Sequence, residues 1–352
     1  MAYTTINKST DYFDTKLHNG NATAKTLAYD FEVDMFWTKM RNYAYPHMIF
    51  DAVRGNNTRL RPNQTNGEGS APNTVSFGNS SGISLGTDSG NYGTNKTQTD
   101  SGSQATYVGW GWKANGAGSS NTDGSITSTV SVNTTAGFSI VKYAGSNSNI
   151  TVGHGLGAVP KMIIIKNLSS ATSWTVYHNS IGNGHRLVLN GEAAKESTNQ
   201  FSFGTSPTSS VFALGGGYGD VCTSGANYIA YCFAEKKGFS KFDSYKGNGN
   251  ADGTFIYTGF KPAFVIIKRS DSTDNWNIFD NKRNEFNLTD KRIYANSANA
   301  EATSSSVSLD FLSNGFKLKG TDSNINNSSG TYTYMSFGQS VVGSNNIPAT
   351  GR

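Results

Sequence analysis

The sequence predicts an all-β protein, and its composition, its aromatic content and an internal repeat are the observations that predict it. Of the 352 residues, 40 are Gly, and Ser, Thr and Asn are also abundant, whereas charged residues make up only 15%. Turn-forming residues and β-branched Thr favour short strands joined by tight turns over long helices. The 17 Tyr, 20 Phe and 5 Trp supply the apolar surface that disordered chains lack. We therefore expect an ordered fold with a sizeable core.

Three segments of the chain resemble one another, which is the most informative feature of the sequence. Each has an apolar run that ends in a lysine (33–39, 160–166 and 262–268) and, after it, a second apolar element (47–51, 174–178 and 276–280). In every copy the last residue of the second element lies 12 residues after the lysine. An aromatic closing segment follows in each copy, at 107–112, 228–233 and 332–337.

The repeat predicts three tandem β-sandwiches of the jelly-roll or lectin-like kind, each of about 100 residues. Runs such as 162–165 are apolar on both faces, as a central strand requires. Copies of this length are too long for solenoid units, so we expect three beads on a chain. The predicted organisation has repeats at 1–113, 137–235 and 236–338, a polar linker or arm at 114–136, and a tail at 339–352 that docks or swaps onto a neighbour.

Charge and hydropathy exclude several classes of partner. The net charge is +5 and the pI is about 9.0, but Lys and Arg are scattered singly, so we expect no nucleic-acid partner. No apolar stretch is long enough to span a bilayer, and the first residues do not resemble a signal peptide. We therefore expect synthesis in a cytoplasm and no membrane insertion. Cys222 and Cys232 are too few for a disulfide framework, and a buried free thiol is expected at Cys232.

Several motifs resemble catalytic or ligand-binding signatures, but each lacks something the chemistry needs. Residues 78–82 match G-x-S-x-G without the strand, turn and helix around it. Residues 248–253 resemble the start of a calcium loop, yet Gly259 stands where the closing carboxylate belongs. Residues 215–219 lack the lysine of a phosphate loop. A zinc site would require His154, His178 and His185 to converge with a fourth ligand.

The recurring Lys39 and Lys268 lie in the same copies as Asp51 and Asp280, whereas the copy of Lys166 has His178 in the place of the aspartate. These residues are consistent with two interpretations, an acid/base pair and a salt bridge at a strand end. Recurrence in every copy favours the structural interpretation, because a catalytic pair needs one enclosed site. We therefore assign no catalytic, cofactor-binding or metal-binding residue, expect no cofactor, and do not expect an enzyme.

Aromatic residues in polar loops were the remaining candidates for binding. Tyr43, Tyr45, Tyr92 and Tyr218 lie among Gly, Asn and Ser, a composition that suits stacking on sugar rings or packing against another subunit. The same residues can equally cover the core of their own repeat. The sequence therefore assigns no binding residue.

Five stretches are similar to a known family: 3–13, 50–55, 112–126, 231–235 and 347–352. On these stretches, nearly the whole chain resembles a family of repeat proteins encoded by tailed phages of marine bacteria, especially cyanophages. The resemblance implies a virion or tail-fibre-like protein with no established catalytic residues. This chain departs from the family pattern at His47, where the usual residue is Trp, and at 337–339, which read Phe-Gly-Gln in place of Phe-Ala-Glu.

The resemblance implies a phage virion structural protein. We expect a short tail fibre or receptor-binding appendage, a homotrimer that adheres to the host surface through many weak contacts. Its expected partners are other virion proteins and a host surface glycan or protein receptor, and its expected location is the virion, assembled in the host cytoplasm. One alternative is a capsid decoration, horn-like projection or connector. Another is a depolymerase of envelope polysaccharide.

Overall fold

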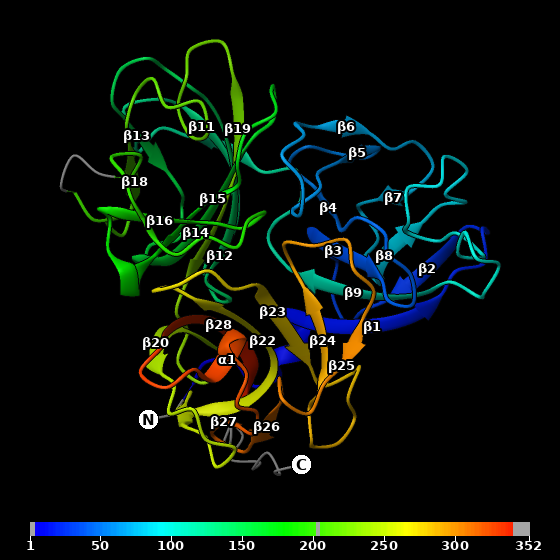
Figure 1. The fold of residues 1–352 in the computed structure, drawn as a ribbon. Coiled ribbons are helices and arrows are strands. Elements are labelled where there is room, and N and C mark those ends of the chain that lie inside the picture. The colour runs from blue at the N-terminus through cyan, green and yellow to red at the C-terminus, as the bar shows by residue number, and fades with distance from the viewer. Residues whose placement is uncertain (1–3, 202–204, 341–352) are drawn as a thin grey trace.

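The computed structural model describes residues 4–201 and 205–340. The prediction of an all-β fold is confirmed, because almost every element is a strand in an antiparallel sheet. The helical elements of the described residues are short: two 3-10 turns at Ser9–Asp11 and Asn179–Ile181, and α1 at Ser323–Asn326. The strands fall into three units, which we define as residues 13–112 (unit 1), 119–234 (unit 2) and 240–340 (unit 3) (Figure 1).

Unit 1 has a larger and a smaller sheet. The larger sheet has the order β1 (Phe13–Asn19), β9 (Thr106–Trp112), β3 (Met35–Met40) and β4 (Met48–Asp51). The smaller sheet has the order β2 (Lys25–Ala28), β8 (Gly82–Leu85) and β7 (Val75–Ser76). A short pair, β5 (Thr58–Arg59) and β6 (Gly69–Ser70), follows β4.

Unit 2 contains the sheet with the most strands in the described part of the chain, eight. Its order is β10 (Ser119–Asn121), β11 (Ser128–Asn133), β12 (Phe138–Ala144), β19 (Asn227–Ala234), β14 (Pro160–Asn167), β15 (Thr175–His178), β16 (His185–Val188) and β17 (Glu196–Ser197). The second sheet pairs β13 (Ile150–Gly153) with β18 (Val211–Leu214). Residues 114–136, expected to be a linker or arm, contain β10 and β11 and so extend this sheet. Alternating Val and Thr or Ser in β11 lets one face be buried, although the segment is polar overall.

Unit 3 repeats the arrangement. The larger sheet has the order β20 (Ser240–Lys246), β28 (Thr331–Ser340), β22 (Phe260–Arg269), β23 (Trp276–Asp280), β24 (Lys291–Tyr294) and β25 (Ala302–Thr303). The smaller sheet has the order β21 (Phe255–Tyr257), β27 (Gly315–Leu318) and β26 (Leu309–Leu312). Because β28 continues to Ser340, it passes the boundary that the sequence placed at 338. The remainder of the predicted tail, 341–352, lies outside the described residues.

The three larger sheets share one strand order. β1, β12 and β20 pair with the closing strands β9, β19 and β28, and each closing strand pairs with the lysine-bearing strand of its unit, β3, β14 or β22. Unit 2 alone adds β10 and β11 before this arrangement. Each unit also has its own apolar core between its two sheets, as a β-sandwich requires. These strand orders agree with a tandem duplication, which itself stays a prediction from the sequence.

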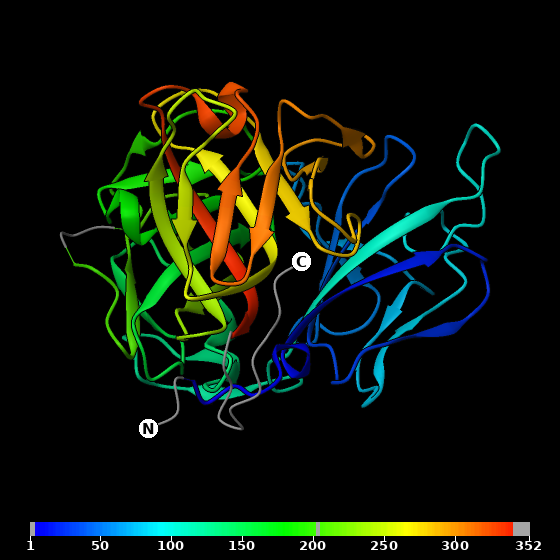
Figure 2. The ribbon, with the colours of Figure 1, turned by 90° about the horizontal axis from the view of Figure 1, so that it is seen from below.

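The expectation of three separate beads is wrong, because one further core is built from all three units. The outer faces of the larger sheets meet at the centre of the molecule, and the units surround that centre (Figure 1; Figure 2). Trp112, Phe233 and Phe337, which end the three closing segments, meet there with ring centroids 6.0–6.5 Å apart. Each larger sheet therefore packs against its own unit's core on one face and against the shared core on the other. This explains why its central strands are apolar on both faces.

Candidate interaction surfaces

Two tryptophans join neighbouring units by equivalent hydrogen bonds. The indole Nε1 of Trp174 in unit 2 donates to the carbonyl oxygen of Arg61 in unit 1 over 3.0 Å. Nε1 of Trp276 in unit 3 donates to the carbonyl oxygen of Val188 in unit 2 over 2.9 Å. Val188 is the last residue of β16, and Arg61 lies just after β5, the corresponding strand of unit 1. Each bond therefore links a unit to the one before it.

His47 makes the same bond at the third junction. Its Nε2 lies 3.0 Å from the carbonyl oxygen of Tyr294 in unit 3. Its Nδ1 accepts a 2.9 Å hydrogen bond from Nε1 of Trp37, so the ring hydrogen is on Nε2. Burial holds the pKa of His47 well below its usual value, which keeps the ring neutral. The replacement of Trp by His47, noted in the sequence, therefore preserves the contact between units.

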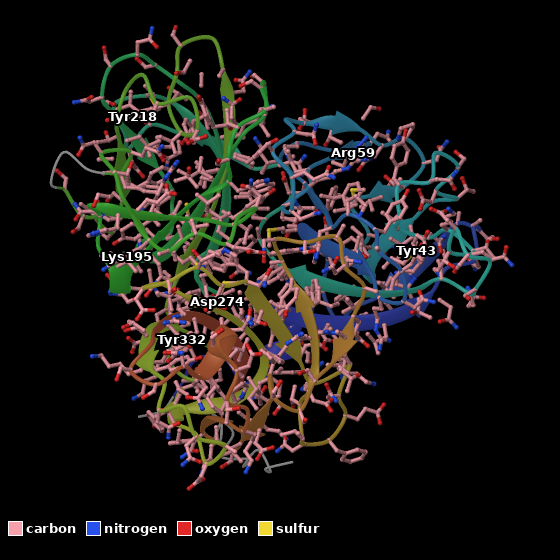
Figure 3. The ribbon with its side chains drawn as sticks, viewed as in Figure 1. Tyr43, Arg59, Lys195, Tyr218, Asp274 and Tyr332 are labelled. Atoms are coloured by element: carbon pink, nitrogen blue, oxygen red, sulfur yellow. The ribbon has the colours of Figure 1, made fainter. Side chains whose placement is uncertain are left out.

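Backbone hydrogen bonds repeat this arrangement at every junction. The residue just before β6, β17 or β25 donates its backbone amide to a carbonyl oxygen just after the lysine-bearing strand of the next unit. These bonds run from Glu68 to Leu168 (2.8 Å), from Lys195 to Ser270 (2.9 Å) and from Glu301 to Arg41 (2.7 Å). Figure 3 labels Lys195 and Asp274, which lie where unit 2 meets unit 3. The three units are therefore tied into a closed ring rather than an open row.

The acidic residues that recur in the sequence form buried ion pairs at two junctions. Oδ2 of Asp51 is 2.5 Å from Nε of Arg54, and Oδ2 of Asp280 is 2.6 Å from Nε of Arg283. All four side chains are fully buried. Because removing two charges from water is costly, such pairs need further hydrogen bonds.

The next unit supplies those hydrogen bonds. The hydroxyl of Tyr231 in unit 2 donates to Oδ2 of Asp51 over 2.8 Å. Nε1 of Trp110 in unit 1 donates to Oδ2 of Asp280 in unit 3 over 3.2 Å. Burial and the Asp51 carboxylate raise the pKa of Tyr231 well above its usual value, so the hydroxyl keeps its proton.

The junction between units 2 and 3 uses uncharged groups instead. His178 stands in the position of Asp51, Ile181 in that of Arg54, and Met335 in that of Tyr231. Met335 has no hydrogen to donate, so a carboxylate here would have no partner across the junction. His178 donates from Nε2 to the carbonyl oxygen of Tyr334 over 3.2 Å. Burial lowers its pKa to about 4, so His178 is neutral at pH 7.

The predicted salt bridge between the recurring lysines and aspartates is wrong. Lys39, Lys166 and Lys268 are fully buried, and their ammonium groups donate to carbonyl oxygens, as Lys166 does to Thr172 over 3.0 Å and Lys268 to Glu192 over 3.0 Å. Asp51 lies across from Met35, at the other end of the strand that carries Lys39. Burial lowers the lysine pKa values, to about 7 for Lys39 and to about 8 for Lys166 and Lys268.

The other residues weighed in the sequence do not converge. Cys222 and Cys232 are buried free thiols. His154 bonds to the carbonyl oxygen of Thr208 in its own unit, whereas His178 bonds to the carbonyl oxygen of Tyr334 in unit 3. Within residues 4–201 and 205–340, no group of three or more His, Cys, Asp or Glu is placed to hold a metal ion.

The loop tyrosines mostly cover their own unit. Tyr45 and Tyr92 pack against the core of unit 1, and the guanidinium of Arg59 lies 4.9 Å from the ring centre of Tyr92. Tyr43 also packs against buried residues. Tyr218, at the far end of unit 2 (Figure 3), is 37% exposed. Of these residues, Tyr218 is the one that offers a sizeable free surface.

Two exposed apolar surfaces in unit 3 were missed by the sequence reasoning. Phe286 is 75% exposed, and it lines a hollow of about 470 Å³ with Leu17 of unit 1. Phe255 and Tyr257 of β21 are 44% and 58% exposed and lie on one face of the strand. A signal for the first was present, because the loop before β24 has ten residues in unit 3 and its counterparts in units 1 and 2 have six.

A family model described as a domain of unknown function, DUF7483, matches residues 8–340. The chain belongs to the DUF7483 family. The match runs across all three units, so one DUF7483 domain corresponds to the whole ring with its shared core. No curated protein matches the chain. Among the described residues, the DUF7483 domain has no helix with the length and hydropathy to cross a bilayer.

Proposed function

We propose that this DUF7483 protein is a virion structural protein of a tailed phage, acting as a short tail fibre or receptor-binding appendage. The resemblance noted in the sequence supports the phage assignment. The observation that carries a binding role is the position of the recurring charged groups. The recurring lysines are buried, and the ion pairs Asp51–Arg54 and Asp280–Arg283 are buried in the junctions, which leaves the outer loops and exposed aromatic side chains as the surfaces that other molecules meet.

The proposed mechanism is non-covalent adhesion to the host surface. The junction bonds fix the three sandwiches relative to one another, so the outer surfaces lose little freedom when they bind. Several weak contacts on one rigid body, multiplied in a homotrimer, combine through effective concentration. No deep pocket is required for strong attachment of this kind.

Immunogold labelling of intact phage particles with antibodies against the purified chain tests this proposal. We expect label at the tail, and we expect the purified protein to compete with particles for adsorption to host cells. Label over the capsid shell would contradict the tail assignment and support a decoration or connector protein. Sustained release of oligosaccharides from host envelope polysaccharide by the purified protein would show a depolymerase instead.

A further inference from the structure

The loop at 281–290 connects β23 to β24 and is longer than its counterparts, 52–57 in unit 1 and 179–184 in unit 2. The additional residues include Phe286, the most exposed of the large apolar side chains among the described residues. Exposing a phenyl ring to water is unfavourable. The insertion occurs in one unit of three, so this exposed ring is not part of the framework that the units share.

Hydrogen bonds hold this loop in place. The side-chain amide of Asn287 donates to the carbonyl oxygen of Phe311 over 3.0 Å, and its oxygen accepts from the amide of Phe311 over 3.0 Å. Thr289 and Leu309 exchange backbone hydrogen bonds of 2.8 and 3.0 Å. The residues after Phe286 are thus anchored to β26, and the side-chain amide of Asn284, before it, donates to Asp290 across the loop over 3.0 Å. Phe286 is therefore presented by an ordered loop, and a partner that binds it does not first have to order the loop.

The hollow beside Phe286 lies between units 1 and 3 and is positively charged. Its lining contains four cationic side chains and one carboxylate: Arg41, Lys282, Arg283, Lys291 and Glu285. Arg41 and Arg283 share the carboxylate of Glu301, at 2.8 and 3.4 Å. Among the described residues, neither Lys282 nor Lys291 lies within ion-pair distance of a carboxylate. Two ammonium groups are thus available to a ligand.

We propose that this hollow binds an acidic polypeptide segment of a partner protein. An apolar side chain of the segment packs against Leu17 and Phe286, and its carboxylates pair with Lys282 and Lys291. A glycan fits less well, because the lining is mainly cationic donors and offers few acceptors for sugar hydroxyls. The chain's own residues 341–352 contain no Asp or Glu, so they lack the matching charge. The inference does not depend on the tail assignment, because the partner can belong to a particle or to a host.

The test is selection of a random peptide library, of about twelve residues per peptide, on the full-length protein, followed by affinity measurement at low and high salt. We expect the selected peptides to combine Asp or Glu with a large apolar residue and to bind more weakly at high salt. Phe286→Ser and the double variant Lys282→Glu/Lys291→Glu should each weaken binding by about tenfold or more. Polygalacturonate serves as the carboxylated polysaccharide in a parallel arm.

Matched controls are Tyr257→Ser, which removes another exposed ring, and Lys246→Glu, which reverses an exposed charge on β20. Both should bind the selected peptides as the unmodified protein does. The proposal is overturned if the selected peptides are not acidic, if Phe286→Ser binds them unchanged, or if polygalacturonate competes for the site as effectively as the peptides do. Circular dichroism and the unfolding midpoint of each variant establish that it is folded.

Discussion

The hydroxyl of Tyr231 in unit 2 donates a 2.8 Å hydrogen bond to the buried carboxylate of Asp51 in unit 1. Trp110 and Asp280 form the same relationship between units 1 and 3. Where the closing strand offers Met335 instead, the facing residue is His178, and the Arg of the ion pair is replaced by Ile181. The residues on the two sides of a junction thus match one another in hydrogen-bonding capacity, because an unsatisfied buried charge costs far more than a neutral pair.

Tyr231→Phe tests the first of these contacts. The substitution keeps the ring and leaves the Asp51 carboxylate without its donor from the next unit, so the free energy of unfolding should fall by about 1–3 kcal/mol. Urea unfolding followed by tryptophan fluorescence measures the change. Tyr257→Phe, at an exposed ring, is the matched control and should change little. Equal stability of Tyr231→Phe and the unmodified protein would show that the bond contributes nothing.

The junction between units 2 and 3 allows a rescue experiment. His178→Asp places a carboxylate opposite Met335 with no donor, so it should destabilise the protein by about 3 kcal/mol or more. Adding Ile181→Arg and Met335→Tyr supplies the ion pair and the donor found at the other junction, and should recover most of that loss. The single variant, the triple variant and the unmodified protein are compared by their denaturation midpoints. If the triple variant is no more stable than His178→Asp, the junctions are not interchangeable.

Acidification should destabilise the protein through His178. Its pKa is about 4 in the folded chain, below the usual 6.5, so the unfolded chain takes up a proton first. Stability is therefore complete above pH 6.5 and falls as pH drops to about 4, with a loss near 3 kcal/mol from this residue at about 1.4 kcal/mol per pKa unit. Urea unfolding at several pH values should show a shallower decline in His178→Gln. His185→Gln, at a partly exposed site, should follow the unmodified protein.

Alkalinisation should have the opposite effect through Lys39. Its folded pKa of about 7 lies below the usual 10.5, so the unfolded chain holds the proton between these values. Stability should therefore rise by about 1.4 kcal/mol per pH unit from pH 7.5 to 9 on account of this residue. Lys39→Met should remove that increment, whereas Lys246→Met, on the surface, should not. A pH profile that is unchanged in Lys39→Met would contradict the lowered pKa of the buried Lys39 side chain.

The shared core predicts that the three units unfold together. Trp112 touches Phe233 of unit 2 and Phe337 of unit 3, so Trp112→Ala should cost about 3–5 kcal/mol. Scanning calorimetry should show a single transition that moves to lower temperature as a whole. Two or three separate transitions, with one shifted by the substitution, would show that the units are independent domains.

The sequence predicted the all-β class and the positions of the lysine-bearing and closing strands, because strand-forming residues and aromatic spacing act locally along the chain. It also singled out Lys39, Asp51 and His47 as recurring or departing positions. It assigned the wrong partners, since it paired Lys39 with Asp51. Lys39 and Asp51 lie at opposite ends of the β3–β4 strand pair. The pairing register of the two strands shows this separation, whereas the number of residues between the two positions does not.

By itself, then, the sequence determined the all-β class, the lysine-bearing and closing strands, and the positions that recur. The tertiary structure alone decided that the larger sheets share a central core, that Tyr231 and Trp110 complete ion pairs in another unit, and that Phe286 stands beside a cationic hollow between two units. These features join residues between about 100 and 270 positions apart. Contacts at such separations depend on how whole sheets pack, and a pattern within one segment carries no information about them.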